Sequence, residues 1–208
     1  MGVATSLLLA SSSPRRAELL ARVGFEFEVV SPRSAERSDV DLTLRELTWL
    51  NAIRKGMPIA RAHPDKVVLA SDTLVALGAE IIGKPSDMEH AARILRRLSG
   101  RTHEVCSTVA IWHVAAGRST AFQEISRVRF RRFTGPQIRN YLAKVNPLDK
   151  AGAYGAQQEG AEIIDEIEGS YTNVVGLPME KTVAALVSFG IRPRGADKPG
   201  FLSPTAGE

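Results

Sequence analysis

The chain has 208 residues, of which 44% are hydrophobic, and its 27 lysines and arginines outnumber its 23 aspartates and glutamates by four. This length and composition suit one sizeable folded domain, and the small positive charge favours an anionic ligand without requiring nucleic acid. The single cysteine, Cys106, excludes an internal disulfide framework, and the absence of histidine or cysteine pairs at ligand spacing argues against a zinc site.

The N-terminal stretch predicts a strand, a turn and a helix. The run from Leu7 to Ala10 is apolar, the serines Ser11–Ser13 can cap a helix, and Pro14 suits its first position. The N–H groups at a helix N-terminus attract anions, and Arg15 and Arg16 oppose the helix dipole unless a negative partner lies in front of them. We interpret this turn as a binding site for a phosphate chain; the alternative is a capped surface helix with two solvated arginines.

A second strand and a loop come next. Gly24 ends the helical pattern, and the sequence FEFEVV at Phe25–Val30 alternates apolar with acidic residues, which is the period of a half-buried strand. The segment Ser31–Asp41 is rich in polar residues and predicts a loop that brings Glu36 near the end of this strand. Strand, helix and strand in this order indicate an α/β fold.

A helix and a buried strand follow this loop. Apolar residues at helical spacing predict a helix over Leu42–Met57 that places Lys55 in its last turns and that Pro58 kinks or ends. The run KVVLAS at Lys66–Ser71 predicts a buried strand, and Asp72 comes directly after it. Ligands bind at strand ends in open α/β sheets, and a buried carboxylate needs a partner. We therefore interpret Asp72 as a functional residue at the end of a strand.

The rest of the chain predicts two hairpins and three further helices. Ser86 and Glu89 form a capping box for a helix over Asp87–Leu98, which Gly100 closes. The other expected elements, in chain order, are strands over Thr73–Leu77 and Glu80–Ile82 around Gly78, strands over Thr102–His113 and Arg118–Phe133, a helix over Gly135–Val145, a strand over Glu162–Ile167, a turn over Gly169–Gly176 and a helix over Pro178–Phe189.

Strand ends and turns gather a set of cations, carboxylates and small polar groups. Such a set suits a metal-bound polyphosphate, because a hard divalent cation takes carboxylate and phosphate oxygens. The segment Asp149–Gly160 is dense in glycine and alanine, which lets a backbone approach a ligand closely. Taken alone, each cation is better explained as a surface charge, and Glu36 as a solvated loop residue. The candidate residues are Ser11, Ser13, Arg15, Arg16, Glu36, Lys55, Asp72, Lys84 and Gln157.

Six ordered blocks resemble the Maf (septum-formation) proteins, which are nucleoside triphosphate pyrophosphatases related in fold to the inosine triphosphate pyrophosphatases. The resemblance covers Leu7 to Leu186 and implies a mixed twisted sheet with flanking helices, in two lobes around a central cleft. We expect one domain over residues 1–189 and a loosely ordered tail, rich in proline and glycine, over 190–208. The blocks are SSSPRR at Ser11–Arg16, SDT at Ser71–Thr73, GKP at Gly83–Pro85, LSGRTHEV at Leu98–Val105, DKAGAYGAQ at Asp149–Gln157 and NVVGLP at Asn173–Pro178.

The resemblance implies hydrolysis of a nucleoside triphosphate to the monophosphate and pyrophosphate, with Mg²⁺ or Mn²⁺. The catalytic aspartate of the family falls on Asp72 and its acidic partner on Glu36, and both would hold the metal. Asp72 would also orient or deprotonate the attacking water, while cations neutralise charge on the phosphates. The basic residues of the family site fall on Arg15, Arg16, Lys55 and Lys84, beside Ser11 and Ser13.

Base choice is implied by a few positions only. Thr73 and Gln157 resemble the branch of the family that acts on dTTP, UTP and modified pyrimidine triphosphates, and Arg15 is a third position linked to base choice there. A buried hydroxyl and amide could read the edge of a pyrimidine. Two positions depart from the family pattern, namely Pro58 in a helix that usually continues and Gln158 where glycine is common, and either could shift the pocket.

Two alternatives stay open at this stage. The same chemistry could act on 7-methyl-GTP or on a non-standard purine triphosphate. A non-enzymatic nucleotide or nucleic-acid binder is suggested by Arg127, Arg129 and Arg131, which alternate along one strand. We interpret these arginines as a solvated strand face, because only 6% of residues are aromatic and a single-strand binder needs stacking platforms.

Location and assembly are also expectations. The apolar run near the N-terminus is four residues long, so we expect neither a signal peptide nor a membrane span, and we expect a cytoplasmic protein. The expected partner is a small nucleoside triphosphate, not nucleic acid or a membrane. Relatives in the family are often dimers, so the resemblance also allows a homodimer.

Overall fold

The computed structural model describes residues 6–33, 41–157 and 159–194 of the chain. In chain order these residues form β1 (Leu7–Ala10), α1 (Pro14–Val23), β2 (Phe27–Val29), α2 (Leu44–Ala62), β3 (Val67–Leu77), β4 (Glu80–Ile82), α3 (Met88–Leu98), β5 (Thr102–His113), β6 (Arg118–Phe130), α4 (Gly135–Lys144), η1 (Ala151–Ala153), α5 (Gly160–Ile163), β7 (Ile164–Glu168), α6 (Tyr171–Val175) and α7 (Met179–Ser188).

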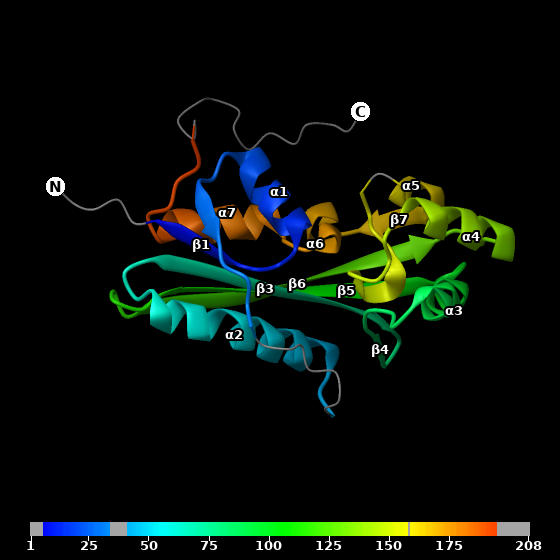
Figure 1. The fold of residues 1–208 in the computed structure, drawn as a ribbon, viewed down its shortest axis with the longest axis horizontal. Coiled ribbons are helices and arrows are strands. Elements are labelled where there is room, and N and C mark those ends of the chain that lie inside the picture. The colour runs from blue at the N-terminus through cyan, green and yellow to red at the C-terminus, as the bar shows by residue number, and fades with distance from the viewer. Residues whose placement is uncertain (1–5, 34–40, 158, 195–208) are drawn as a thin grey trace.

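The strands of this described part form one mixed sheet in the order β2, β1, β3, β5, β6, β7, with β4 paired to β3. The strand β1 is parallel to β2 and to β3, and the other pairs are antiparallel. Helix α2 covers one face of the sheet, and α1, α6 and α7 lie on the other (Figure 1). The mixed α/β sheet with flanking helices, expected from the sequence, is therefore confirmed.

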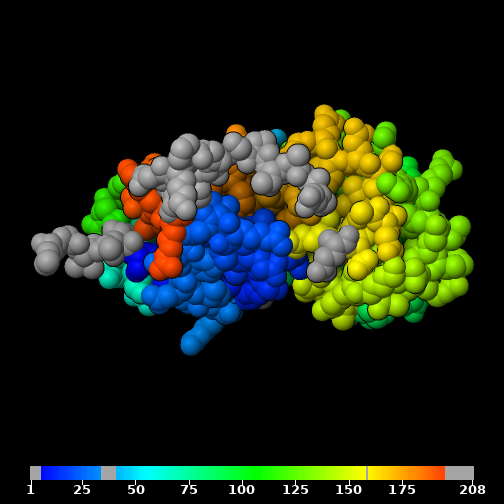
Figure 2. All heavy atoms as spheres, turned by 90° about the horizontal axis from the view of Figure 1, so that it is seen from above, coloured from blue at the N-terminus to red at the C-terminus, as the bar shows by residue number. Residues whose placement is uncertain are grey.

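The two ends of the sheet carry different helices. Figure 2 shows α1 (blue) in one half of the molecule and the segment around α4 and α5 (yellow-green to yellow) in the other. Each end has its own hydrophobic core, the first built on β1, α1 and α7 and the second on α3, α4 and the far ends of β5 and β6. Segments that come from both ends can therefore meet only near the middle of the sheet.

The short strand β1 lies between β2 and β3 and is apolar on both faces. Leu7 and Leu9 pack in the core that includes α1 and α7, whereas Leu8 and Ala10 pack in the core beneath α2. Successive side chains of a strand point to opposite faces, so a continuous apolar run is typical of a strand that helices cover on both sides.

Pro58 lies inside α2, and the expectation of a helix that ends near Met57 is wrong. A proline in a helix removes its own N–H donor and crowds the carbonyl four residues earlier, which belongs to Arg54. Both Pro58 and Arg54 are exposed, so water can satisfy that carbonyl. The helix therefore continues to Ala62.

The sequence predicts that Asp72 follows the end of a strand, but in the structure Asp72 lies in the middle of β3. The neighbouring strand β5 pairs with β3 without interruption, and Asp72 is opposite Thr108. The strand continues because Asp72 finds partners in α2, which are described below, so its charge does not force the chain into solvent.

Several other boundaries differ from expectation. The cap of α3 is Asp87, whose carboxylate accepts a 2.7 Å hydrogen bond from the His90 amide, and the expected box from Ser86 does not form. The short helices α5 and α6 occupy the start of the expected Glu162–Ile167 strand and the expected turn over Gly169–Gly176. Most of the tail over 190–208, and Gln158, lie outside the described residues.

Candidate active site

A gap in the pairing along one edge of β3 marks the site. Along this edge β3 pairs with β1 as far as Ala70 and with β4 from Val75 onward, so residues 71–74 have a described strand neighbour, β5, on the other side only. The chain leaves β1 at Ala10, and the serine-rich turn that follows lies beside this break. Asp72 and Thr73, on this stretch of β3, line a cavity at the break.

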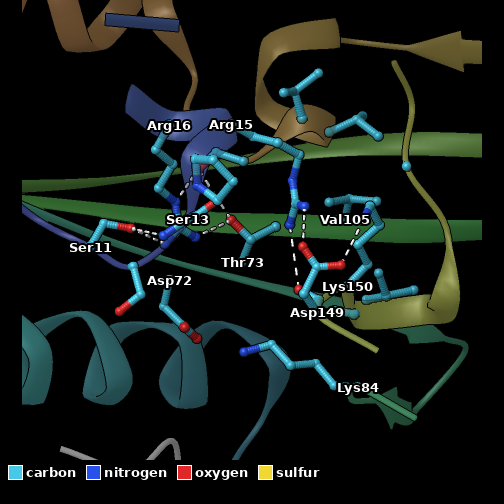
Figure 3. A pocket seen from close by; sticks show the side chains of 18 of the residues that line it. Ser11, Ser13, Arg15, Arg16, Asp72, Thr73, Lys84, Val105, Asp149 and Lys150 are labelled. Carbon is cyan, nitrogen blue, oxygen red and sulfur yellow. Dashed lines mark hydrogen bonds and ion pairs between the residues drawn. The ribbon is translucent and has the colours of Figure 1, made fainter. Parts of the chain in front are cut away.

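The cavity at this break has a volume of about 460 Å³, within the range of small-molecule sites. Its polar lining comes from the start of α1, from β3 and from the segment before η1, and its apolar lining includes Val75, Val105 and Tyr154 (Figure 3). Of the predicted residues, those that line it are Ser11, Ser13, Arg15, Arg16, Lys55, Asp72, Thr73 and Lys84.

One predicted residue of the described chain does not line the cavity. Gly155 and Ala156 line the cavity, but Gln157, the next residue along the chain, does not. Glu36 lies outside the described residues. The roles assigned to both residues stay predictions.

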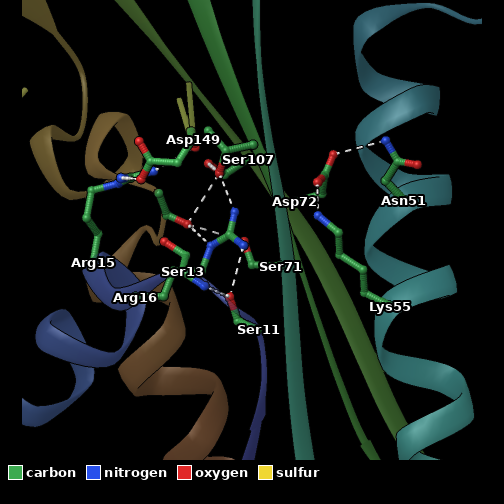
Figure 4. A network of polar contacts seen from close by, with 12 residues as sticks. Ser11, Ser13, Arg15, Arg16, Asn51, Lys55, Ser71, Asp72, Ser107 and Asp149 are labelled. Atoms are coloured by element: carbon green, nitrogen blue, oxygen red, sulfur yellow. Dashed lines mark hydrogen bonds and ion pairs between the residues drawn. The ribbon is translucent and has the colours of Figure 1, made fainter. Parts of the chain in front are cut away.

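Alternation along β3 sends its polar side chains to opposite faces of the sheet. Asp72 points toward α2, while Ser71 lies on the face of α1 and α6 (Figure 4). Ser71 and Thr73 both donate to the Gly176 carbonyl, at 3.3 Å each. Asp72 and Thr73 therefore line the cavity from two sides, and Ser71 is buried behind it.

On the α2 side, Asp72 is held by two residues of that helix. Lys55 Nζ lies 2.5 Å from Asp72 Oδ1, and Asn51 Nδ2 donates to Oδ2 at 3.3 Å. Asn51 and Lys55 are four residues apart and so share one face of the helix. Asp72 is only 2% exposed, so its carboxylate has the partners that a buried charge requires.

Gly56 lets α2 approach the sheet closely beside this pair. A Cβ at this position would lie 2.2 Å from the ring of Trp112 and 2.6 Å from the Cβ of Ala70, which real side chains do not tolerate. Any larger residue would push the helix outward. The glycine therefore sets the distance at which Lys55 meets Asp72.

On the opposite side, Arg16 joins four segments of the chain. Its guanidinium donates from Nε to the Gly176 carbonyl at 2.8 Å, from one terminal nitrogen to Ser11 Oγ at 3.3 Å and from the other to Thr73 Oγ1 at 3.0 Å. The residue is buried, and these acceptors are uncharged. These contacts give Arg16 a positioning role at the site, in addition to the phosphate binding that the sequence predicts.

Arg15 has a negative partner, but it is a carboxylate of the protein. One guanidinium nitrogen lies 2.7 Å from Asp149 Oδ2, and Lys150 Nζ lies 2.6 Å from the other carboxylate oxygen. Burial acts to raise the pKa of Asp149, but hydrogen bonds from Lys150 and Arg15 outweigh it and hold that pKa below its ordinary value. Asp149 and Lys150 line the cavity and were missed as site residues; their place in the DKAGAYGAQ block was the available signal.

Tyr154 forms part of the apolar wall and is fixed from behind. Its hydroxyl lies 2.8 Å from His103 Nε2, and both rings pack edge-on against Phe130. Burial lowers the pKa of His103 to about 4 and raises the pKa of Tyr154. Both groups are therefore neutral near pH 7, and this wall presents no charge to a ligand.

The described residues could hold a divalent metal only together with a ligand. No three carboxylate, histidine or cysteine side chains of the described residues lie close enough to form a metal site on their own. Asp72 lines the cavity and offers carboxylate oxygens, and one or two carboxylates with substrate phosphates are the usual ligands of Mg²⁺. The donor set therefore fits a metal that arrives with a phosphate-bearing ligand.

The three alternating arginines lie away from this cavity. Arg127, Arg129 and Arg131 are each more than half exposed, which confirms a solvated face. They also pair with carboxylates of β7, with 2.9 Å between Arg129 Nε and Asp165 Oδ2. A strip so neutralised is a poor surface for nucleic acid.

Comparison with known proteins relates this fold and site to one family. The family model described as "Maf-like protein" matches residues 6–189. The dTTP/UTP pyrophosphatase of Bacillus pumilus is 42% identical over 188 residues, which cover 90% of this chain and 98% of that protein. The protein of the same name from Dictyoglomus turgidum is 40% identical over 190 residues, covering 88% and 96%.

A solved structure supports the fold alone. The Staphylococcus aureus Ham1 protein superposes with a TM-score of 0.50 at 16% identity, covering 89% of this chain and all of that one. Within the described residues, none of the helices combines the length and the apolar character that crossing a bilayer requires.

Proposed function

Because the chain belongs to the family of Maf-like proteins, we propose that it hydrolyses dTTP and UTP, and modified pyrimidine triphosphates, to the nucleoside monophosphate and pyrophosphate. The observation that carries this proposal is the buried carboxylate of Asp72, held by Lys55 in a cavity that also presents serine hydroxyls and Lys84. A carboxylate can orient or deprotonate a water molecule, and nearby cations stabilise the negative charge of the phosphates.

In the proposed reaction a water oxygen forms a bond to the α-phosphorus, and the bond from this phosphorus to the bridging oxygen of the β-phosphate breaks. The electron pair of that bond leaves with pyrophosphate, and the proton of the water passes to a base and then to solvent. Asp72 orients or deprotonates this water, and Lys55 holds the Asp72 carboxylate in place.

The phosphates are bound by the turn before α1 and by cations. Ser11 and Ser13 lie at the N-terminus of this helix, where backbone N–H groups favour anions, and Lys84 reaches the cavity from the segment after β4. Asp72 and Glu36 are the proposed ligands of a divalent ion such as Mg²⁺ or Mn²⁺, which supplies positive charge to the phosphate oxygens when bound.

The base lies, in this proposal, against the apolar wall on the other side of the cavity. Tyr154 and Val105 give it a flat uncharged surface, and Thr73, Arg15 and Gln157 select a pyrimidine. Support comes from Thr73, whose hydroxyl is already fixed by Arg16 and lies 2.8 Å from that of Ser107. A fixed hydroxyl discriminates better than a mobile one, because it does not turn to suit a different base.

A product assay tests the activity. Purified protein with Mg²⁺ is offered dTTP, UTP, 7-methyl-GTP and ITP separately, and pyrophosphate and orthophosphate are measured for each. We expect pyrophosphate and the monophosphate from dTTP and UTP. Orthophosphate as the first product would contradict the proposed reaction, and faster turnover of 7-methyl-GTP or ITP would contradict the proposed substrate.

We also propose a cytoplasmic enzyme that acts as a homodimer. The lone cysteine, Cys106, is buried and reduced, which suits a reducing compartment. Light scattering during gel filtration measures the assembly directly, and a mass of one chain would exclude the dimer.

A further inference from the structure

The carboxylate of Asp149 lies between two cations in the active-site cavity, and the proposed reaction gives it no role. Its Oδ2 accepts a 2.7 Å hydrogen bond from Arg15 Nη1, and its Oδ1 accepts one of 2.6 Å from Lys150 Nζ. All three residues line the cavity, and Figure 3 shows the carboxylate between the two cationic groups. They therefore present a row of donor, acceptor and donor to this cavity.

The backbone holds this row in place. Lys150 Nζ also donates to the Asn146 carbonyl at 2.6 Å, and Arg15 donates to the backbone carbonyl of Asp149 at 3.4 Å. A Cβ at Gly155 would lie 3.2 Å from Lys150 Cε, so the lysine side chain packs against the residue that follows Tyr154. The row therefore lies beside the apolar wall against which the base rests in the proposed function.

The row can bind a ligand in addition to its internal contacts. The Asp149 side chain is 42% exposed. A carboxylate has more acceptor sites than two cations occupy, and guanidinium and ammonium groups each carry several N–H donors. Burial acts to raise the pKa of Asp149, but hydrogen bonds from Lys150 and Arg15 keep that pKa below its ordinary value. The carboxylate is therefore ionised near pH 7, where it accepts hydrogen bonds and cannot donate one.

The bases of pyrimidine nucleotides differ in the edge that would meet such a row. Uracil and thymine present an acceptor, a donor and an acceptor, namely O2, N3–H and O4, which complement a donor, an acceptor and a donor. Cytosine presents O2, an N3 lone pair and an amino group, so its N3 would oppose the carboxylate and its amino group would oppose a cation. The 5-methyl group of thymine lies off this edge. The row therefore suits uracil and thymine alike and opposes cytosine at two positions.

We propose that Asp149 selects uracil and thymine by accepting a hydrogen bond from N3–H, while Arg15 and Lys150 donate to the two ring carbonyls. This inference rests on the proposed function, because that function places the base of a pyrimidine triphosphate in this cavity. It assigns specificity to Asp149 and Lys150, and it explains why one site would accept dTTP and UTP but reject CTP.

Equilibrium binding tests the selection without requiring turnover. The ligands are the α,β-methylene analogues of UTP and CTP, in which carbon replaces the bridging oxygen, and isothermal titration calorimetry of the full chain with Mg²⁺ measures each Kd. We expect the uridine analogue to bind about 30-fold more tightly than the cytidine analogue. Asp149→Asn should raise the Kd of the uridine analogue about 10-fold and leave that of the cytidine analogue within about threefold, because an amide can donate to cytosine N3.

The matched control is Asp165→Asn, which takes a carboxylate from Arg129 as Asp149→Asn takes one from Arg15, but outside the cavity lining. It should leave both Kd values unchanged. If Asp149 only held Arg15 in place, Asp149→Asn would raise the Kd of both analogues by the same factor. That result, or equal Kd values of the two analogues for the wild-type protein, would overturn the proposal.

A third ligand tests the same contact on the unaltered protein. The 3-methyluridine analogue keeps both carbonyls of uracil but has no N3–H, so we expect it to bind as weakly as the cytidine analogue. Binding as tight as that of the uridine analogue would show that Asp149 does not accept from N3. None of these titrations depends on hydrolysis, so an absence of pyrophosphate release in the product assay would contradict the proposed function alone.

Discussion

Lys55 and Asp72 face each other between α2 and β3, with 2.5 Å from Nζ to Oδ1 and side chains that are 10% and 3% exposed. Each is the charged partner of the other in a place where water hardly reaches. An ion pair so buried adds little to stability by itself, yet removing one partner leaves the other charge uncompensated. Structure and proposed chemistry are therefore coupled at this pair.

Asp72→Asn separates the two roles when it is compared with the Asp72→Asn/Lys55→Met double variant. The single variant is expected to lose about 3–5 kcal/mol of unfolding free energy, because the buried Lys55 ammonium loses its ion pair with the Asp72 carboxylate. The double variant removes both charges and regains most of that stability. Both variants release pyrophosphate at least about 10³-fold more slowly, because the base is gone. Urea denaturation and the product assay measure the two effects, and activity in the double variant would rule out the assigned role of Asp72.

Arg16→Lys and Arg15→Lys form a matched pair of neighbouring substitutions. Lysine keeps the charge of Arg16 but cannot bond Gly176, Ser11 and Thr73 together, so we expect a loss of about 2–3 kcal/mol in unfolding free energy. Arg15 is partly exposed and its ion pair with Asp149 lies near the surface, so Arg15→Lys should change stability by less than about 1 kcal/mol. Denaturant titration gives both values, and equal losses would contradict the different roles that the contacts indicate.

His103 makes stability depend on pH in a defined window. Its pKa is about 4 in the folded protein and about 6.5 when exposed, so the unfolded chain takes up this proton first as the pH falls. The contribution is complete above pH 6.5 and is lost between pH 6.5 and 4, which corresponds to about 2 kcal/mol between pH 7 and pH 5. His103→Gln, which does not titrate, should therefore show a shallower loss of stability over this range.

Tyr154→Phe is the companion variant for this experiment. It removes the hydroxyl that contacts His103 but leaves the imidazole buried, and burial is the cause of the lowered pKa. The pH dependence of wild type should therefore persist in Tyr154→Phe. Parallel curves for wild type and His103→Gln, recorded by thermal unfolding at several pH values, would show that another group is responsible.

Patterns within a short stretch of sequence predict those strands and helices whose limits do not depend on distant residues. The apolar run from Leu7 to Ala10 predicts the bounds of β1 correctly, because a short strand that is buried on both faces is apolar throughout. The end of α2 cannot be predicted from Pro58 alone. The free-energy cost of a proline inside a helix depends on whether the carbonyl of Arg54 reaches water, and this depends on how the helix packs. The end of β3 was placed too early, because a charge that closes a strand in isolation is tolerated once a helix brings Lys55 to it.

Contacts across long stretches of sequence could not be foreseen in the same way. The serine-rich turn and Asp72 were singled out by their residue types, and the structure places both at one cavity. The partner that opposes Arg15, however, is Asp149, 134 residues further along the chain. The carbonyl that accepts from Arg16 belongs to Gly176, and a pattern of side chains does not predict a contact to a backbone carbonyl.

The opening beside β3 has a width fixed by the lengths of two other strands, since β1 stops at Ala10 and β4 resumes pairing at Val75. Insertions or deletions that change the length of β1 or β4 would therefore widen or close this opening more than substitutions of side chains would. Extending β1 by two residues would close this opening, whereas shortening the hairpin of β3 and β4 would let larger ligands enter. Evolution or engineering could in this way adjust the capacity of the enzyme while every residue of its chemistry stays in place.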